Sequence, residues 1–128
     1  MTLAINDLFS VAGKVAIVTG GSRGIGRMIA EGFVENGVRT YITARKADAC
    51  AETAAELSKK GECIALPADL STKEGREAFV AEITAREAKI DVLVNNAGFG
   101  SSGLFHEIES ARLDDEIALN IRALTRLS

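Results

Sequence analysis

The stretch Thr19-Gly20-Gly21-Ser22-Arg23-Gly24-Ile25-Gly26 decides the fold of this chain. It follows the apolar run Val15 to Val18, and a helical pattern begins at about Ile25. The first N–H groups of a helix lack intrahelical partners and carry partial positive charge, so they bind phosphate where the backbone can come close. Glycine permits that approach because it has no Cβ and accepts the φ > 0 of a tight turn. The stretch therefore predicts a phosphate site.

Apolar runs and helical spacings alternate along the rest of the chain. We expect strands at about residues 14–19, 38–44, 63–68 and 91–95, each followed by a helix, at about 25–36, 48–60, 71–88 and 113–124. Unbroken apolar runs suit strands covered on both faces, as in parallel sheets. The pattern predicts an α/β fold: a Rossmann-like, doubly wound parallel sheet with strand order 3-2-1-4 and helices on both faces. We expect residues 1–128 to form a single domain.

Two segments flank the crevice of such a sheet. Ligands bind outside the carboxyl ends of the strands at the switch point, here between the first and fourth strands. These strands end in Thr19-Gly20 and in Asn95-Asn96-Ala97-Gly98. Two adjacent amides and a glycine at a strand end suit a wall that a ribose approaches, although the segment alone could be an Asn-rich turn.

The glycine turn is also close to a P-loop. The segment Gly21 to Gly26 has the G-x-x-x-x-G spacing, but Arg27-Met28 stands where Lys and Ser/Thr would hold phosphate and Mg²⁺. Without a hydroxyl ligand for the metal, the sequence disfavours a nucleotide hydrolase. Such a protein would bind ATP in a Mg²⁺-dependent manner.

Composition and charge exclude several classes of protein. The 128 residues carry a formal net charge of -3 and no basic run, which argues against a nucleic-acid partner. The apolar runs are too short for a membrane span, and the segment Met1 to Phe9 lacks the basic cluster of a secretory signal. Cys50 and Cys63 have neither metal spacing nor a disulfide pattern, which indicates a reducing, cytoplasmic location. We expect no metal site, and the lone His106 is interpreted as a surface or loop residue.

Three cations are predicted near an adenosine ribose. The second strand ends about twenty residues past the glycine turn, where an acidic residue would bind the ribose 2′-OH and a cation would select a 2′-phosphate. This sequence has Arg45 and Lys46 there and Arg23 inside the turn. The charges therefore favour NADP(H) over NAD(H). The alternative is that all three are ordinary solvated side chains.

Two local structures are predicted away from the crevice. Ser71 and Glu74 have the spacing of a capping box, which would start the helix that follows the third strand. The lead-in before Gly13 carries Leu8, Phe9 and Val11, which we expect to pack on the sheet edge.

Together these motifs resemble the short-chain dehydrogenase/reductase family. The glycine turn has the spacing T-G-x-x-x-G-x-G, and Asp69-Leu70, Asn95 to Gly98 and Asn120 follow in the order and spacing of the family. The resemblance covers essentially all of the chain after residue 10. Through about Gly98 it is similar to the branch of 3-oxoacyl and rhamnolipid-type ketoreductases, and from Phe99 onward it looks more like another branch.

The resemblance implies roles for particular residues. The cofactor-binding set is Gly20, Ser22, Arg23, Gly24, Ile25, Gly26, Arg45, Lys46, Asp69, Leu70, Asn95, Ala97 and Gly98. Asp69 and the neighbouring backbone would contact the adenine edge, although an Asp before a helix also suits a simple turn. Asn120 would be the helix asparagine of the catalytic tetrad, which holds a water through its backbone. The alternative for Asn120 is a hydrogen-bonded buried or interface amide.

The chain also departs from the family pattern. Hydride chemistry in the family needs a Ser that polarises the carbonyl, a Tyr that donates the proton and a Lys four residues after the Tyr. The sequence ends at Ser128 before these positions, and its one tyrosine, Tyr41, lies in the second predicted strand. Whether the chain is itself an enzyme is therefore open, and the fold is expected to be truncated relative to the family.

The expected function is the NADP(H)-binding portion of a short-chain oxidoreductase. In the complete protein the resemblance implies reduction of a carbonyl substrate, such as a 3-oxoacyl thioester, by hydride transfer. The alternatives are a non-catalytic dinucleotide-binding or scaffold module, and a truncated or engineered fragment that only binds cofactor. An open sheet edge and an uncovered apolar stripe on the last helix predict a homo-oligomer, or a partner that supplies the missing strands.

Overall fold

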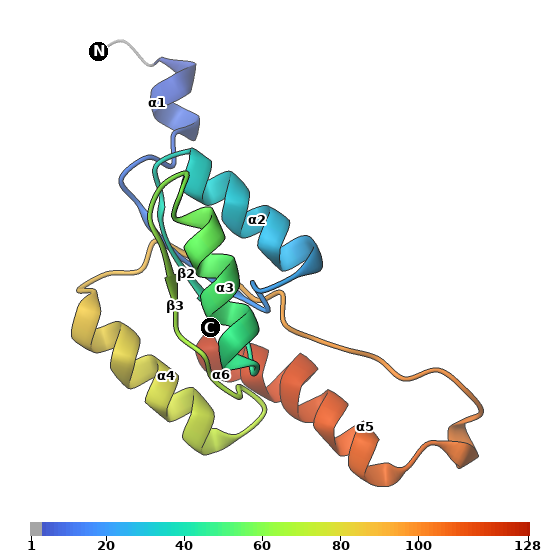
Figure 1. The fold of residues 1–128 in the computed structure, drawn as a ribbon. Helices are drawn as coiled ribbons and strands as arrows, with labels where there is room; N and C mark the ends of the chain where they lie inside the picture. Colours follow the sequence, from blue (N-terminus) through green and yellow to red (C-terminus); the bar gives the residue numbers. More distant parts are fainter. Residues whose placement is uncertain (1–3) are drawn as a thin grey trace.

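A parallel sheet of four strands forms the centre of the fold (Figure 1). The computed structural model describes residues 4–128, so the part of the predicted lead-in at residues 1–3 lies outside the described residues. The strands are β1 (Val15–Thr19), β2 (Arg39–Thr43), β3 (Cys63–Ala65) and β4 (Val92–Val94). They pair in the order β3-β2-β1-β4, and every pair is parallel. The predicted fold class and strand order are confirmed.

Helices cover both faces of this sheet (Figure 1). One face is covered by α2 (Gly24–Glu35) and α3 (Ala47–Leu57). The other face is covered by α4 (Lys73–Arg86) and by the end of the chain. That last region is one helical run, made of α5 (Ser110–Ile117), the π-helical segment η2 (Ala118–Ala123) and α6 (Leu124–Leu127). Two short helices complete the chain, α1 (Ile5–Phe9) and the 3-10 turn η1 (Phe105–Glu107).

Alternate residues of the strands pack into two separate hydrophobic cores, one on each face of the sheet. Val18 and Ile42 pack toward α2 and α3, whereas their neighbours Ile17 and Tyr41 pack toward α4 and η2. Successive side chains of a strand point to opposite faces, so both sets must be apolar when both faces are covered. The continuous apolar runs of the sequence therefore predicted this arrangement correctly.

The strand register places the carboxyl ends of the central strands at one edge. Thr19 lies opposite Thr43 of β2, and Val18 lies opposite Val94 of β4. The glycine turn after β1, the segment after β2 and residues 95–98 after β4 therefore meet at the same edge of the sheet.

The predicted capping box at the start of α4 is wrong. Thr72 is the N-cap, and its Oγ1 accepts a hydrogen bond of 3.0 Å from the backbone N–H of Gly75. The Ser71 hydroxyl instead donates to Asp69 Oδ1 at 2.6 Å. Because the Asp69 carboxylate engages Ser71, the helix starts one residue later than the spacing indicated.

The predicted packing of the lead-in is also wrong. The side chains of Leu8 and Phe9 are 57% and 79% exposed, and no residue of α1 is buried. Val11 is only partly buried. The short helix α1 extends away from the sheet (Figure 1), so its apolar residues find no sheet surface to cover.

A buried phenol connects the middle of β2 to the end of α4. The Tyr41 side chain is fully buried, and its hydroxyl donates to Glu87 Oε1 at 2.6 Å. The same carboxylate oxygen lies 3.0 Å from Arg39 Nε. Burial, together with the hydrogen bond to Glu87, raises the pKa of Tyr41, so the phenol remains a hydrogen-bond donor at neutral pH.

Asp91 makes the corresponding connection between β4 and β1. Its Oδ2 accepts a hydrogen bond of 2.9 Å from the backbone N–H of Val15, and its Oδ1 lies 2.7 Å from Lys89 Nζ. The hydrogen bond from Lys89 and the one from the Val15 backbone lower the pKa of Asp91.

The lowered pKa of Asp91 predicts a pH dependence of stability. A carboxyl group with a lower pKa in the folded chain stabilises the fold above its unfolded pKa, and this contribution is lost as pH falls through the folded pKa. In Asp91→Asn we expect a lower urea midpoint at neutral pH than in the parent chain. We also expect this midpoint to fall less steeply as the pH is lowered from about 5 to about 3. The exposed Asp114→Asn is the control and should follow the parent curve. If the urea midpoints of Asp91→Asn and the parent changed with pH in parallel, Asp91 would not be the source of this pH dependence.

Candidate functional site

The glycine turn is fixed to the end of β2 by two backbone hydrogen bonds. The N–H groups of Gly20 and Gly21 donate to the carbonyl oxygen of Thr43 at 2.9 and 3.2 Å. Gly20 has φ of 66° and Gly24 has φ of 57°, values that L side chains rarely adopt. These glycines allow the chain to turn from β1 directly into α2.

The beginning of α2 presents a row of free backbone donors. Within the described residues 4–128, the N–H groups of residues 22–26 have no hydrogen-bond partner. The first turn of α2 contains no acidic side chain, and a Cβ on Gly24 would meet no atom within 4 Å. Unpaired N–H groups at an open helix N-terminus form an anion site, with the partial positive charge of the helix behind them.

Gly26 sets how closely α2 crosses the sheet. A Cβ on this buried glycine would overlap the carbonyl oxygen of Gly20 and lie 2.5 Å from Asn96 Nδ2. Only glycine therefore fits at this crossing without a shift of the helix. The helix start is thereby held against both β1 and the segment after β4.

Thr19 and Asn96 join the ends of β1 and β4. Thr19 Oγ1 accepts hydrogen bonds from the N–H groups of Asn96 (3.0 Å) and Ala97 (2.9 Å) and donates to the Val94 carbonyl at 3.3 Å. Asn96 Nδ2 donates to the carbonyl oxygens of Thr19 and Gly20 at 3.0 and 3.3 Å. Neither residue belongs to the cofactor-binding set that the family resemblance implies. Two features of the sequence could have indicated these contacts: Thr19 places a hydroxyl directly before the first glycine of the turn, and Asn96 is the second of two adjacent asparagines.

Asn120 holds the loop after β4 through its side chain. Its Nδ2 donates to the Phe99 carbonyl at 2.7 Å, and its Oδ1 accepts from the Phe99 N–H at 3.0 Å. The amide thus pairs with the Phe99 backbone as a neighbouring strand would. A Cβ on Gly98 would lie 2.9 Å from Asn120 Oδ1, so Gly98 also suits this approach. Asn120 lies in η2, and such π-helical segments occur often at functional sites.

The loop after Gly98 is tied to α5 by a cation. The Arg112 guanidinium lies 5.2 Å from the centre of the Phe99 ring, and its Nε donates to Ser101 Oγ at 2.7 Å. Ser101 also donates to the Glu116 carboxylate. These contacts orient the loop on the same edge of the sheet as the glycine turn. His106 lies beyond this loop, and its side chain is 76% exposed, as expected of a surface histidine.

The three predicted selectivity cations are all exposed at this edge. Arg23 is the N-cap residue of α2, Arg45 lies between β2 and α3, and Lys46 is the N-cap residue of α3. In the part of the chain that the structure describes, none of them forms an ion pair. Their charge is therefore available to an anionic ligand.

Asp69 and Leu70 lie after β3 and offer different groups to a ligand. Asp69 Oδ1 accepts from the N–H and hydroxyl of Ser71 at 3.0 and 2.6 Å, and Oδ2 has no partner among residues 4–128. The Leu70 side chain is only 4% exposed and packs in the core. Its carbonyl accepts from Arg76. Leu70 can therefore contact a ligand only through its backbone.

The remaining predicted residues border the same edge. The Ser22 carbonyl accepts a 2.8 Å hydrogen bond from Thr53 Oγ1, which fixes the turn to α3. Ile25 is 70% exposed at the start of α2, and Asn95 Nδ2 donates to Ser128 Oγ at 3.0 Å. Cys50 lies beneath the turn between β2 and α3, where burial raises the pKa of its thiol. Cys50 is therefore a packing residue rather than a nucleophile.

Two further features bear on the possible ligands. Across residues 4–128, no three His, Cys, Asp or Glu side chains are grouped as a metal ion would require. Over the same residues, every helix is too short or too polar to cross a bilayer.

The open helix start, the close glycine crossing and the switch point between β1 and β4 define a dinucleotide-binding α/β fold. The family profile described as short chain dehydrogenase matches residues 14–128, and the chain belongs to this family.

Relatives and solved structures support the same assignment. The rhamnolipids biosynthesis 3-oxoacyl-[acyl-carrier-protein] reductase of Pseudomonas aeruginosa is 54% identical over 94 residues, which are 73% of this chain and 37% of that protein. The 5-keto-D-gluconate 5-reductase of Escherichia coli is 36% identical over 128 residues, which are 97% of this chain and 49% of that protein. The chain thus spans between about a third and a half of the length of these relatives.

Two structures determined with cofactor superpose closely on this chain. The Pseudomonas aeruginosa RhlG/NADP active-site complex has a TM-score of 0.86 at 44% identity, and the match covers 91% of this chain and 46% of that one. L-sorbose reductase from Gluconobacter frateurii, complexed with NADPH and L-sorbose, has a TM-score of 0.87 at 36% identity. That match covers 92% of this chain and 46% of the reductase.

A pair of glycines in α2 tests the close crossing at the site. Gly26→Ala should destabilise the fold by about 1 to 3 kcal/mol, because the added methyl group forces α2 away from Gly20 and Asn96. Gly32→Ala places the same methyl group in the same helix where a Cβ meets no atom within 4 Å, and should stabilise by about 0.5 to 1 kcal/mol. Urea unfolding of both variants measures these changes, and equal midpoints would contradict the crossing as described.

Proposed function

We propose that this chain binds NADP(H) and forms the cofactor-binding portion of a short-chain oxidoreductase. The observation that carries the proposal is the row of unpaired N–H groups at residues 22–26, which lies at the switch point between β1 and β4. These donors suit the pyrophosphate of a dinucleotide. The solved relatives bound to NADP or NADPH support the choice of ligand.

The exposed cations would select the phosphorylated cofactor. Arg23, Arg45 and Lys46 would surround the 2′-phosphate of the adenosine ribose, because Arg45 and Lys46 stand just after β2, where an acidic residue would bind a free 2′-OH. The unpartnered Oδ2 of Asp69 would accept from the adenine amino group. Guanidinium groups pair with phosphate through two parallel N–H bonds, so we assign the larger share of selectivity to the arginines.

The segment after β4 would form the wall along the nicotinamide ribose. Thr19 fixes the backbone of Asn96 and Ala97, and Asn120 fixes the backbone of Phe99, so this wall is positioned before a ligand arrives. NADPH held along this wall would supply a hydride to a carbonyl carbon. Because the Asn120 side chain is occupied by Phe99, its backbone carbonyl is the group left to hold a water in a proton relay.

For the whole protein we propose carbonyl reduction to an alcohol. The relatives named above act on 3-oxoacyl-[acyl-carrier-protein], 5-keto-D-gluconate and L-sorbose, so a ketone is the shared chemical class. The second candidate is a non-catalytic dinucleotide-binding module, favoured by the burial of Tyr41 away from the site. The buried free thiols of Cys50 and Cys63 support our proposal of a reducing, cytoplasmic location.

Cofactor selectivity is tested by reversing the charge of Arg45. Arg45→Asp should lower the affinity for NADPH by about tenfold or more and leave the affinity for NADH nearly unchanged, since a charge-assisted hydrogen bond contributes about 1.5 to 3 kcal/mol. Calorimetric titration with each cofactor measures the ratio of the two affinities. Lys59→Asp, which makes the same change of charge on an exposed turn, should leave the ratio as it is in the parent. An unchanged ratio in Arg45→Asp would refute the role of Arg45.

We also propose that the chain self-associates through its last helical run. Ile117, Ile121 and Leu124 are 48%, 59% and 42% exposed and recur at helical spacing. Static light scattering at micromolar concentration should give at least twice the monomer mass of 13.5 kDa. Ile121→Glu should shift the mass toward the monomer. A parent chain that scatters as a monomer would count against self-association.

A further inference from the structure

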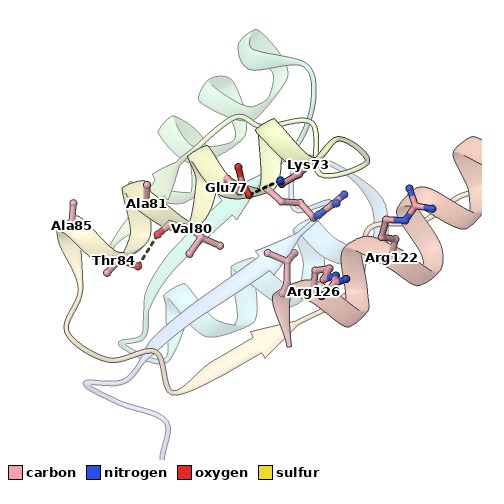
Figure 2. A pocket seen from close by; sticks show the side chains of 10 residues that line it. Lys73, Glu77, Val80, Ala81, Thr84, Ala85, Arg122 and Arg126 are labelled. Carbon is pink, nitrogen blue, oxygen red and sulfur yellow. Dashed lines mark hydrogen bonds and ion pairs between the residues drawn. The ribbon is translucent and has the colours of Figure 1, made fainter.

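A groove between α4 and the last helical run lies on the face of the sheet opposite α2 and α3 (Figure 2). Its volume is about 1090 Å³. It is lined by Lys73, Arg76, Glu77, Val80, Ala81, Thr84 and Ala85 from α4, and by Arg122, Arg126 and Leu127 from η2 and α6. None of the residues assigned to the dinucleotide lines it.

Arg76 brings a buried positive charge to this groove. The residue is only 8% exposed. Its NH1 donates to the carbonyl oxygens of Leu70 and Ser71 at 2.9 and 3.0 Å, which are neutral acceptors. Among residues 4–128, Arg76 has no carboxylate partner, and its other guanidinium nitrogens have no hydrogen-bond partner. A buried charge without a counter-ion is costly, so this guanidinium favours an anion beside it.

Two further guanidinium groups face α4 across the groove. Figure 2 shows Arg122 and Arg126 on the helical run opposite Lys73 and Glu77. In the described part of the chain neither arginine forms an ion pair, whereas Lys73 lies 3.7 Å from Glu77. The lining thus has four cations and one carboxylate, in a chain whose net charge is -3. The groove therefore has an excess of positive charge on a chain that is negative overall.

Apart from Thr84, whose hydroxyl donates to the Val80 carbonyl at 2.8 Å, the rest of the lining is apolar. Val80 is 47% exposed, and Ala81, Ala85 and Leu127 continue this surface. In Figure 2 the labelled side chains of Val80 and Ala81 lie further along α4 than Lys73 and Glu77. A ligand that fills the groove would therefore meet guanidinium groups with one part and hydrocarbon with another.

We propose that this groove is a second binding site, for a small amphipathic oxyanion. A phosphate or carboxylate head group would pair with Arg76, Arg122 and Arg126, and an alkyl chain would lie along Val80 and Leu127. Guanidinium groups bind both head groups through parallel N–H bonds. The site goes beyond the proposed cofactor function because it uses other residues on the face covered by α4 and α6.

Matched probes separate the contributions of head group and chain. Calorimetric titration of the 128-residue chain with octyl phosphate should show saturable binding to one site. Inorganic phosphate should bind at least about tenfold more weakly, because it buries no methylene groups. Octanol should not bind, because it has no charge for the arginines. Octanoate tests whether a carboxylate replaces the phosphate; octanoate and octyl phosphate should both lose affinity in the arginine variants.

Substitutions on the exposed side of the groove test the site without disturbing the core. Arg122→Gln and Arg126→Gln should each weaken octyl phosphate by about tenfold, the effect of one lost charge-assisted hydrogen bond. Arg76→Met should weaken it further. Arg86→Gln is the matched control on α4, since Arg86 is exposed, pairs with Glu82 at 3.2 Å and does not line the groove.

Arg45→Asp separates this site from the dinucleotide site. Octyl phosphate binding that survives Arg45→Asp and is lost in Arg122→Gln and Arg126→Gln supports the groove. The groove proposal is wrong if Arg45→Asp alone abolishes binding, if octanol binds as tightly as octyl phosphate, or if octyl phosphate does not bind. It is also wrong if the arginine substitutions disrupt self-association of the chain and leave octyl phosphate binding unchanged. None of these results decides whether the chain binds NADPH, because the proposed cofactor site uses other residues and is tested by its own titration.

Discussion

The backbone of α2 crosses the carboxyl end of β1 so closely that no Cβ fits between them. At this crossing Gly26 lies against the Gly20 carbonyl and the Asn96 side chain. The contact holds the free N–H groups of the helix start directly beside the ends of β1 and β4. If α2 lay further from the sheet, these donors would no longer border the crevice. The whole candidate site therefore depends on the absence of a side chain at one position.

Much of this arrangement could be predicted from the sequence because it is governed by local patterns. The apolar runs of β1 and β2 indicate strands buried on both faces, and the glycines after Thr19 indicate a turn into a helix. The order 3-2-1-4 is then the one expected of a doubly wound sheet, whose right-handed crossovers place helices on both faces. The capping of α4 was mispredicted because Asp69 competes for the Ser71 hydroxyl, a contact that spacing alone does not reveal.

The details that complete the site arise between distant segments. Thr19 and Asn96 are 77 residues apart, and their hydrogen bonds exist only in the register that β1 and β4 adopt. The π-helical turn around Asn120 leaves no trace in the spacing of apolar residues, yet it presents the amide to the Phe99 backbone. Asn120 could be identified from the family resemblance, whereas the contact of its side chain with Phe99 is visible only in the structure.

The single tyrosine has a consequence for spectroscopy. The chain contains no tryptophan, so its intrinsic ultraviolet emission comes from Tyr41 alone among the strongly emitting side chains. That phenol is buried and hydrogen-bonded to the Glu87 carboxylate, which lies one residue beyond α4. Its signal therefore reports whether the end of α4 is seated against β2. Reduced nicotinamide absorbs and emits at longer wavelengths, so one sample offers separate optical channels for folding and for ligand.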